Sequence, residues 1–291
     1  MIAMYRCFVI ALCFLLAAAA AASAQSRQQS PQGASAQDEP EANPGRPTVA
    51  TPATLTPVGY VQFETGVLAA WHSPGVVSQT SINEVIKYSP SRWIELLVAS
   101  QPYAHSHAVG QPTNAAGDVG LGVQGILYHG ENLKPTVAVS YLGRVYSGAA
   151  PNLDIGGPAN SALLLVSGDV KSFHYDANCI FNEVVNGQVR RGEFGQTISV
   201  SHALVGKFGI SGELWHFTQP FLHGNAVANL WAVSYAARRN LVLDCGFDHG
   251  FTSTSTQWEA FAGFTYLLPH KLPLTWPRSR GTKSYVPSGF F

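Results

Sequence analysis

The side chains of His174, Asp176 and Asn178 have the types and the spacing of a possible catalytic or metal-binding site. They occupy alternate positions of one segment, so a β-strand would place them on one face, as a proton relay or as metal ligands. A strand that lines a polar, water-filled interior produces the same spacing without any catalytic role. We therefore predict that these residues line an interior and take no part in catalysis or metal binding.

Two further pairs combine residue types found in hydrolases and metal sites. Ser201 and His202 are adjacent, and adjacent strand residues point to opposite faces, so they cannot form a nucleophile and base pair. His105 and His107 lie two apart in a predicted loop beside Tyr103 and could bind a metal weakly. An ordinary surface loop is the simpler interpretation of this second pair.

Sequence motifs for cofactors are missing. The chain contains no Walker loop, no dinucleotide fingerprint and no metalloprotease helix. The glycines of Asp118-Val119-Gly120-Leu121-Gly122 lie inside a predicted strand, where they thin the wall or permit curvature. We predict a protein that is not an enzyme and that has no catalytic residues, no cofactor and no metal.

These residues belong to a long series of segments that alternate between apolar and polar positions. In the last segment, Trp258 and Phe264 share one parity and Glu259 and Thr265 share the other, which is typical of a strand between two different media. The predicted strands are 58–70, 80–88, 93–101, 118–128, 136–146, 161–166, 171–184, 194–204, 207–217, 226–235, 241–247 and 258–268.

Connection lengths alternate along these strands. After even-numbered strands the connections are tight, whereas after odd-numbered strands several are longer, as in 102–117, 147–160 and 185–193. Short turns at one end and longer loops at the other are typical of an outer-membrane barrel with an even strand count and periplasmic termini. We predict an all-β fold, a transmembrane antiparallel up-and-down β-barrel of about 12 strands, closed by pairing of 258–268 with 58–70.

A soluble sandwich or a lipocalin-like barrel is the competing fold, because it shows the same alternation with its apolar side chains inside. Aromatic residues near the predicted strand ends favour the membrane barrel, which gathers such residues in girdles at its two interfaces. These residues are Trp71, Tyr88, Tyr128, Trp231, Tyr235, Trp258 and Tyr266.

The predicted barrel interior is acidic. Residues 58–268 hold ten Lys and Arg against fourteen Asp and Glu, and six of the ten bases lie in or beside the tight turns. An open pore of this kind would favour cations, whereas mutual pairing of the charges would fill a narrow barrel. The side chains predicted to line the lumen are Glu64, Lys87, Glu95, Asp118, Arg144, His174, Asp176, Glu213, Asp244 and Glu259.

The two ends of the chain differ in composition from the predicted barrel, 58–268. Residues 1–24 place Arg6 before an apolar run that ends in Ala22-Ser23-Ala24, which is typical of a cleaved signal peptide. Residues 25–57, rich in Gln, Ser, Ala and Pro, predict a disordered periplasmic extension, with a plug inside the barrel as the alternative. Residues 269–291, with four bases and no acids, predict a basic periplasmic tail.

Two cysteines, Cys179 and Cys245, remain after the leader. Each lies on the apolar parity of its strand, and the two strands are four apart in the predicted order, beyond the short reach of a disulfide. We interpret both cysteines as small hydrophobic residues of the outer wall.

Several of these segments resemble one known family of bacterial outer-membrane β-barrels, labelled "MetA-pathway of phenol degradation" or "transporter". The resemblance rests on residues 82–96 as a strand, tight turn and strand, on the Gly-Asp strand at 117–124, and on the closing strand 258–268. It covers about residues 55–268, and the tail beyond 269 is a departure from the family pattern. The resemblance implies a barrel that passes small, aromatic or apolar compounds, and it brings no catalytic residues.

We therefore predict a channel in the outer membrane, exported through a cleaved signal peptide, for passive uptake of small molecules, aromatic or apolar compounds among them. Expected partners are outer-membrane lipid, the small-molecule solute and the barrel-insertion machinery, and no nucleic acid. The alternatives are a closed barrel with a structural or binding role and a barrel enzyme acting on lipids. The resemblance also implies an insertion signal at Gly263, Tyr266 and Leu268, with Phe261 where a polar residue is usual.

Overall fold

A computed structural model describes residues 40–107, 112–131 and 133–272 of the chain. The signal peptide expected at 1–24 and most of the basic tail, 273–291, lie outside these residues. In the described part the strands are β1 (Val61–Trp71), β2 (Ser78–Ser91), β3 (Ile94–His107), β4 (Pro112–Ala115), β5 (Val119–Tyr128), β6 (Thr136–Tyr146), β7 (Gly157–Val170), β8 (Phe173–Asn186), β9 (Val189–Ala203), β10 (Phe208–Gln219), β11 (Gly224–Arg238), β12 (Leu241–Gly250) and β13 (Trp258–Leu267).

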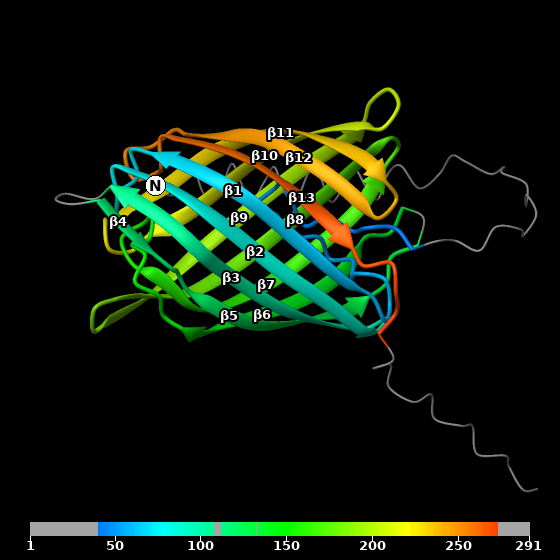
Figure 1. The fold of residues 1–291 in the computed structure, drawn as a ribbon, viewed down its shortest axis with the longest axis horizontal. Coiled ribbons are helices and arrows are strands. Elements are labelled where there is room, and N and C mark those ends of the chain that lie inside the picture. Colours follow the sequence, from blue (N-terminus) through cyan, green and yellow to red (C-terminus); the bar gives the residue numbers. More distant parts are fainter. Residues whose placement is uncertain (1–39, 108–111, 132, 273–291) are drawn as a thin grey trace, which may run out of the picture.

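Twelve of these strands form a closed antiparallel ring, with each strand beside its neighbour in the sequence (Figure 1). β1 pairs with β2 on one edge and with β13 on the other, so that Phe63 lies opposite Tyr266 and Trp71 opposite Trp258. The short strand β4 pairs only with β3 and is not one of the twelve strands of the ring. The predicted barrel, its strand number and its closing pair are confirmed.

The ring has two different ends. The turn end carries the connections at 92–93, 129–135, 171–172, 204–207 and 239–240, and the loop end carries those at 72–77, 108–118, 147–156, 187–188, 220–223 and 251–257. The loop expected at 185–193 is wrong. β8 and β9 continue as a hairpin to Asn186 and Val189, and the turn at Gly187 has a φ of 60°, which glycine adopts at little cost.

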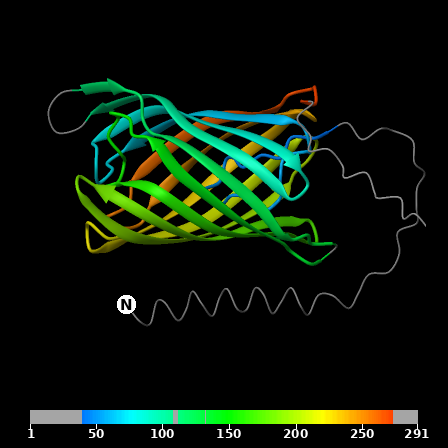
Figure 2. The ribbon, with the colours of Figure 1, turned by 90° about the horizontal axis from the view of Figure 1, so that it is seen from below.

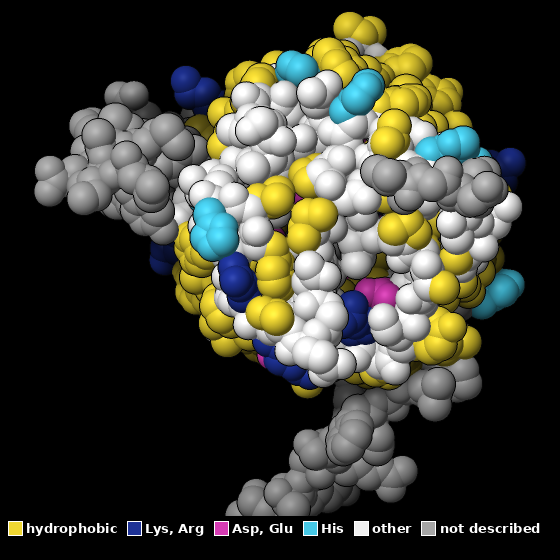
Figure 3. All heavy atoms as spheres, turned by 90° about the vertical axis from the view of Figure 1, so that its left-hand side faces the viewer, with side chains coloured by type: hydrophobic (Ala, Val, Ile, Leu, Met, Phe, Trp, Pro, Cys, Tyr) yellow, Lys and Arg dark blue, Asp and Glu magenta, His cyan; other side chains and the backbone are white. Residues whose placement is uncertain are grey.

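Side chains alternate along the strands between a polar interior and an apolar exterior. On β1, Gln62 and Glu64 are buried while Val67 is exposed, and the closing strand buries Thr265 beside the exposed Phe264. Figure 3, a view onto the loop end, shows apolar side chains gathered around the outer wall. The exposed exterior is therefore an apolar belt, as in a barrel whose outer surface does not face water.

Several aromatic residues of this belt lie at its two ends, whereas others, such as Tyr141 at the centre of β6, do not. Trp71 and Trp258 lie opposite each other at the loop end, Tyr128 is the last residue of β5 at the turn end, and Tyr235 lies three residues before the end of β11 there. The expectation that Trp231 lies near an interface is wrong: it lies at the centre of β11, and it is already in the middle of the predicted strand 226–235. Within the described residues, no helix is long and apolar enough to cross a membrane.

The cysteines lie where the alternation places them. Cys179 on β8 is partly buried and Cys245 on β12 is exposed, and both are free thiols. Three strands, β9 to β11, separate them in the ring. The two residues are part of the outer wall.

Candidate functional site

Residues 40–57, called the inner segment below, lie inside the barrel (Figures 1 and 2). Ala50 and Ala53 have no exposed surface, and Thr56 is almost completely buried. The expected disordered periplasmic extension is therefore wrong for residues 40–57, and the alternative of a plug describes them. Residues 25–39 lie outside the described residues. The inner segment is ordered although it is poor in large apolar residues. It needs no apolar core of its own, because the barrel wall supplies its packing and hydrogen-bond partners.

Both ends of the inner segment lie at the turn end. The backbone N–H of Ala42 donates to the carbonyl of Arg239 at 2.9 Å, in the β11–β12 turn, and Gly59 donates to the carbonyl of Ser89 at 2.8 Å. Between these points Val49 and Ala50 reach Glu213, in the middle of β10. The inner segment thus enters from the turn end, reaches mid-barrel and returns.

Wall carboxylates accept the backbone N–H groups that an irregular segment cannot pair with itself. The carboxylate of Glu213 accepts hydrogen bonds from the backbone N–H groups of Val49 and Ala50, at 2.7 Å each. It also accepts one from the hydroxyl of Thr197. Glu95 accepts from Thr56 at 2.7 Å. Because an unpaired buried N–H group is costly and a charged acceptor gives the stronger hydrogen bonds, these contacts hold the inner segment in a defined position.

Neutral side chains hold the rest of the inner segment. The amide of Asn178 accepts from the N–H of Thr51 at 2.6 Å and donates to its carbonyl at 2.9 Å. Ser167 accepts from the N–H of Ala53 at 2.6 Å. The sequence predicts that Asn178 faces water in the lumen, but its side chain is only 4% exposed. Its amide bonds the backbone of Thr51 as a neighbouring β-strand would.

A small apolar core joins the inner segment to one side of the wall. Ala53 packs with Ile126 of β5, Ala138 of β6 and Leu165 of β7, and Leu55 packs against this cluster. Apolar side chains on the inner face of a barrel would be unfavourable against water. Their presence here shows that this part of the lumen is built around an apolar occupant.

Several of the predicted lumen charges form ion pairs in the turn-end and central parts of the barrel, whereas Glu95 and Glu213 accept hydrogen bonds from the inner segment instead. Lys87 and Glu64 form a buried ion pair at 2.6 Å, and Glu64 also accepts from the N–H of Gly45 at 2.9 Å. Arg46 of the inner segment reaches Asp244 at 3.2 Å. The alternative in which charges pair with one another therefore describes this part of the lumen. Arg144 and Asp118 form a further pair at 2.8 Å near the loop end.

Replacing Lys87 with Met should destabilise the barrel by about 3–5 kcal/mol, because Glu64 would be left as a buried charge without its base. Unfolding by urea, followed by the shift in gel mobility between folded and unfolded protein, measures this loss. The double variant K87M/E64Q should recover most of the stability, since it removes both charges. Equal stability of K87M and the natural protein would show that the pair is not buried.

The loop end has a different electrostatic character. Residues 151–156 of the β6–β7 loop fold toward the mouth, where Gln79 of β2 donates to the carbonyl of Pro151 at 2.8 Å and Gly75 donates to that of Leu153 at 2.7 Å. Burial raises the pKa of the Asp154 carboxyl above its usual range. The loop therefore brings a carboxylate into the mouth of the barrel.

Three wall carboxylates join Asp154 in this acidic mouth. The charge of Asp154 acts on Glu193 of β9 and on Glu259 of β13, and Asp248 of β12 acts on Glu259 as well. Asp248 accepts from the indole N–H of Trp215 at 2.5 Å. Within the described residues none of the four carboxyl groups forms an ion pair with Lys or Arg, so no neighbouring base balances the negative charge that this part of the lumen carries.

His174 and its neighbours do not form a catalytic site. Its Nδ1 lies 2.8 Å from Asp169 and its Nε2 lies 3.4 Å from Asp176. Ser201 lies opposite His174 in the β8–β9 register, but the imidazole has both nitrogens directed at carboxylates and offers no lone pair to a serine. His202 points the other way and bonds the carbonyl of Ser172. The arrangement does not support a hydrolase.

Sequence reasoning missed four participants in these contacts. Asp248 lies one residue beyond the predicted strand 241–247, and its parity, shared with Asp244, could have revealed it. Glu193 falls in the predicted loop 185–193, whereas in the structure it lies in β9. Asp154 and Arg46 lie in irregular segments, where no periodicity shows which way a side chain points.

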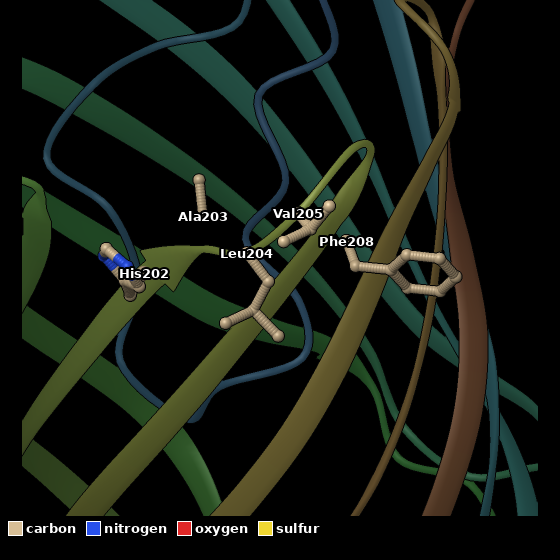
Figure 4. Close-up of a pocket in the computed structure, with 5 residues that line it drawn as sticks. All are labelled: His202, Ala203, Leu204, Val205 and Phe208. Atoms are coloured by element: carbon tan, nitrogen blue, oxygen red, sulfur yellow. The ribbon is translucent and has the colours of Figure 1, made fainter.

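A shallow apolar pocket on the outer wall is separate from the lumen. His202, Ala203, Leu204, Val205 and Phe208 line it around the β9–β10 turn (Figure 4). Val205 is 92% exposed, so the turn projects from the barrel. The pocket has few polar groups to orient a solute and belongs to the apolar belt at the turn end.

Solved structures share this fold at low sequence identity. An outer membrane channel from Pseudomonas putida F1 is 11% identical, with a TM-score of 0.55 over 78% of this chain and 100% of that chain. The NanC porin is 10% identical, with a TM-score of 0.51 over 72% of this chain and 100% of that chain. No known family profile and no curated protein matches the sequence. The likeness shows a common barrel fold.

Proposed function

We propose that this protein is an outer-membrane channel for passive passage of small molecules, and that the inner segment closes it in the present conformation. The observation that carries the proposal is a closed twelve-strand ring with an apolar exterior and a polar interior. The two solved structures with the same fold bear the names of a channel and a porin, which supports the proposal.

The exterior fits a bilayer. Leu121, Leu164 and Phe247 are exposed apolar residues of the wall, and paired tryptophans at the loop end and tyrosines at the turn end fit the two interfaces. Residues 1–24 would direct export, and the barrel-insertion machinery would place the ring in the membrane. Fractionation of cells tests this step: recovery in the soluble fraction would remove the basis of the proposal.

The solute is proposed from two sources. The resemblance to the phenol-degradation transporter family supports small aromatic or apolar compounds. The acidic mouth at Asp154, Glu193, Asp248 and Glu259 supports neutral or cationic solutes over anions, because like charges at a narrow entrance repel anions.

A barrel that lacks the inner segment should prefer cations, and the variant D154N/E259Q in that background should lose much of the preference. Each substitution keeps the side-chain size and removes one ionisable carboxyl group from the mouth. The reversal potential across a planar bilayer under a salt gradient measures the effect. E183Q is the matched control, since Glu183 already pairs with Arg190 at 2.9 Å on the rim. Unchanged selectivity in D154N/E259Q would reject the acidic mouth as the selective element.

A closed barrel with a structural role is the second candidate, and the occupied lumen favours it. The two functions differ in one respect, which is whether the inner segment can leave. Its contacts with the wall are hydrogen bonds, the Arg46–Asp244 ion pair and a small apolar cluster, with no disulfide to the wall within the described residues.

A further inference from the structure

We propose that His105 and His107 form a binding site for one divalent ion of the zinc type at the loop end. This inference is independent of the proposed channel function and departs from the expectation of no metal. The pair was expected in a loop, where two residues have no fixed relation. The structure extends β3 to His107, and strand geometry places residues two apart on one face.

The two imidazoles are spaced as ligands of one ion. Their Nε2 atoms lie 3.2 Å apart. Two nitrogens at the usual zinc distance and a tetrahedral angle lie about 3.3 Å apart, so the observed spacing needs almost no adjustment. The ring centres lie 5.1 Å apart. Rings that converge on a zinc ion would have centres about 5.2 Å apart, so the hydrogen-bonded pair already has the spacing that an ion would need.

The ring of His105 is held in the orientation that a ligand needs. Its Nδ1 lies 2.7 Å from the side-chain oxygen of Asn114, which also accepts from the hydroxyl of Tyr103 at 3.0 Å. Because this amide oxygen can only accept, Nδ1 carries the proton and Nε2 presents its lone pair toward His107. Metal-binding histidines typically donate their second nitrogen in this way.

The backbone beneath the pair is fixed as well. Ala104 and Ser106 point inward and are buried, and Ser106 accepts from Gln79 of β2 at 2.8 Å. β4 pairs with β3 at this point, so that Asn114 lies opposite His105. The two histidines therefore stand on a strand with partners on both sides, which lowers the entropic cost of binding.

The ligand set selects the type of ion. Neutral imidazoles suit Zn²⁺, Cu²⁺ and Ni²⁺, whereas Ca²⁺ and Mg²⁺ prefer oxygen ligands. The described residues hold no group of three or more metal-ligating side chains, so water would complete the coordination. Without the ion, the Nε2–H of His107 donates to His105. On binding, this proton moves to Nδ1 of His107 through solvent, so that Nε2 presents its lone pair to the ion.

Titration of untagged, refolded protein with Zn²⁺ in a calorimeter tests the site. We expect one saturable site that H105Q and H107Q each abolish, and that N114A weakens about 10-fold or more because the ring loses its hydrogen-bond partner. H129Q is the matched control at the turn end, where His129 packs against Trp93, and it should bind as the natural protein does.

A second measurement does not depend on the folding of variants. With one equivalent of Cu²⁺, pulsed electron paramagnetic resonance of the natural protein should show two equivalent imidazole nitrogens on the copper. A single imidazole, or Zn²⁺ binding that survives in both H105Q and H107Q, would overturn the proposal. Gel mobility of the folded form confirms that each variant is a complete barrel.

Discussion

Deletion of residues 40–56 should open the barrel and raise solute flux more than any single substitution in the inner wall. The inner segment fills the lumen from the turn end to the level of Glu213, and the wall behind it is largely polar. Once the segment is absent, water can occupy the space and solvate Glu95 and Glu213, which lose only N–H partners. The ring itself keeps every strand pairing, because no strand of the described residues begins before Val61.

Swelling of liposomes in an isotonic solution of a small neutral sugar measures this flux. We expect slow swelling with the natural protein and fast swelling with the deletion variant. E213A offers an intermediate case, because it removes the acceptor for Val49 and Ala50 and leaves the remaining contacts in place. Slow swelling with a correctly folded deletion variant would support the closed structural barrel.

Replacement of Leu164 with Arg should have the largest effect on assembly. Leu164 lies at the middle of β7, faces outward and is exposed. A base at the bilayer midplane costs a transmembrane barrel about 2–4 kcal/mol, whereas one near an interface costs about 0–1 kcal/mol. The folded fraction after refolding into lipid vesicles should therefore fall sharply for L164R.

V189R is the matched control for L164R. Val189 is also exposed, but it lies at the tip of the β8–β9 hairpin next to Arg190 and Arg191, outside the apolar belt. We expect V189R to refold as the natural protein does. If L164R and V189R refolded equally well, or both refolded better in water without lipid, the exterior of the barrel would not be a lipid-facing surface.

The strands could be predicted from the sequence because period-two alternation depends only on which medium each face meets. The same rule predicted the closing pair of β1 and β13 and placed most of the other strands to within a few residues. It also predicted that Glu64, Glu95 and Glu213 point inward. The ends of the strands were less certain, since the β8–β9 hairpin continues beyond the belt, where both faces meet water.

The plug could not be predicted from the composition of residues 25–57, because its partners lie on strands far away in the sequence. One indication was available in β7, where Leu163, Leu164 and Leu165 are apolar on both faces. A barrel strand facing only water inside would show polar residues at one parity. Leu165 packs against Ala53. The apolar residue on the inner face of β7 therefore indicates that an apolar segment occupies the lumen there.

The sequence predicts which charged side chains point into the lumen, but it does not predict which of them form ion pairs. Parity gave the inward direction of the charged wall residues, yet whether a charge is paired depends on Arg46 and on the fold of residues 151–156. Both belong to irregular segments whose positions follow from tertiary contacts. The separation into a paired interior and an acidic mouth therefore required the structure.

Single-channel recording tests the central claim, that the inner segment closes a membrane channel, most directly. The deletion variant is inserted in a planar bilayer, and a synthetic peptide of residues 40–57 is then added on the side of the turn end. We predict a steady current that falls toward the low level of the natural protein when the peptide is added. A natural protein that conducts as well as the deletion variant, with no response to the peptide, would contradict the claim.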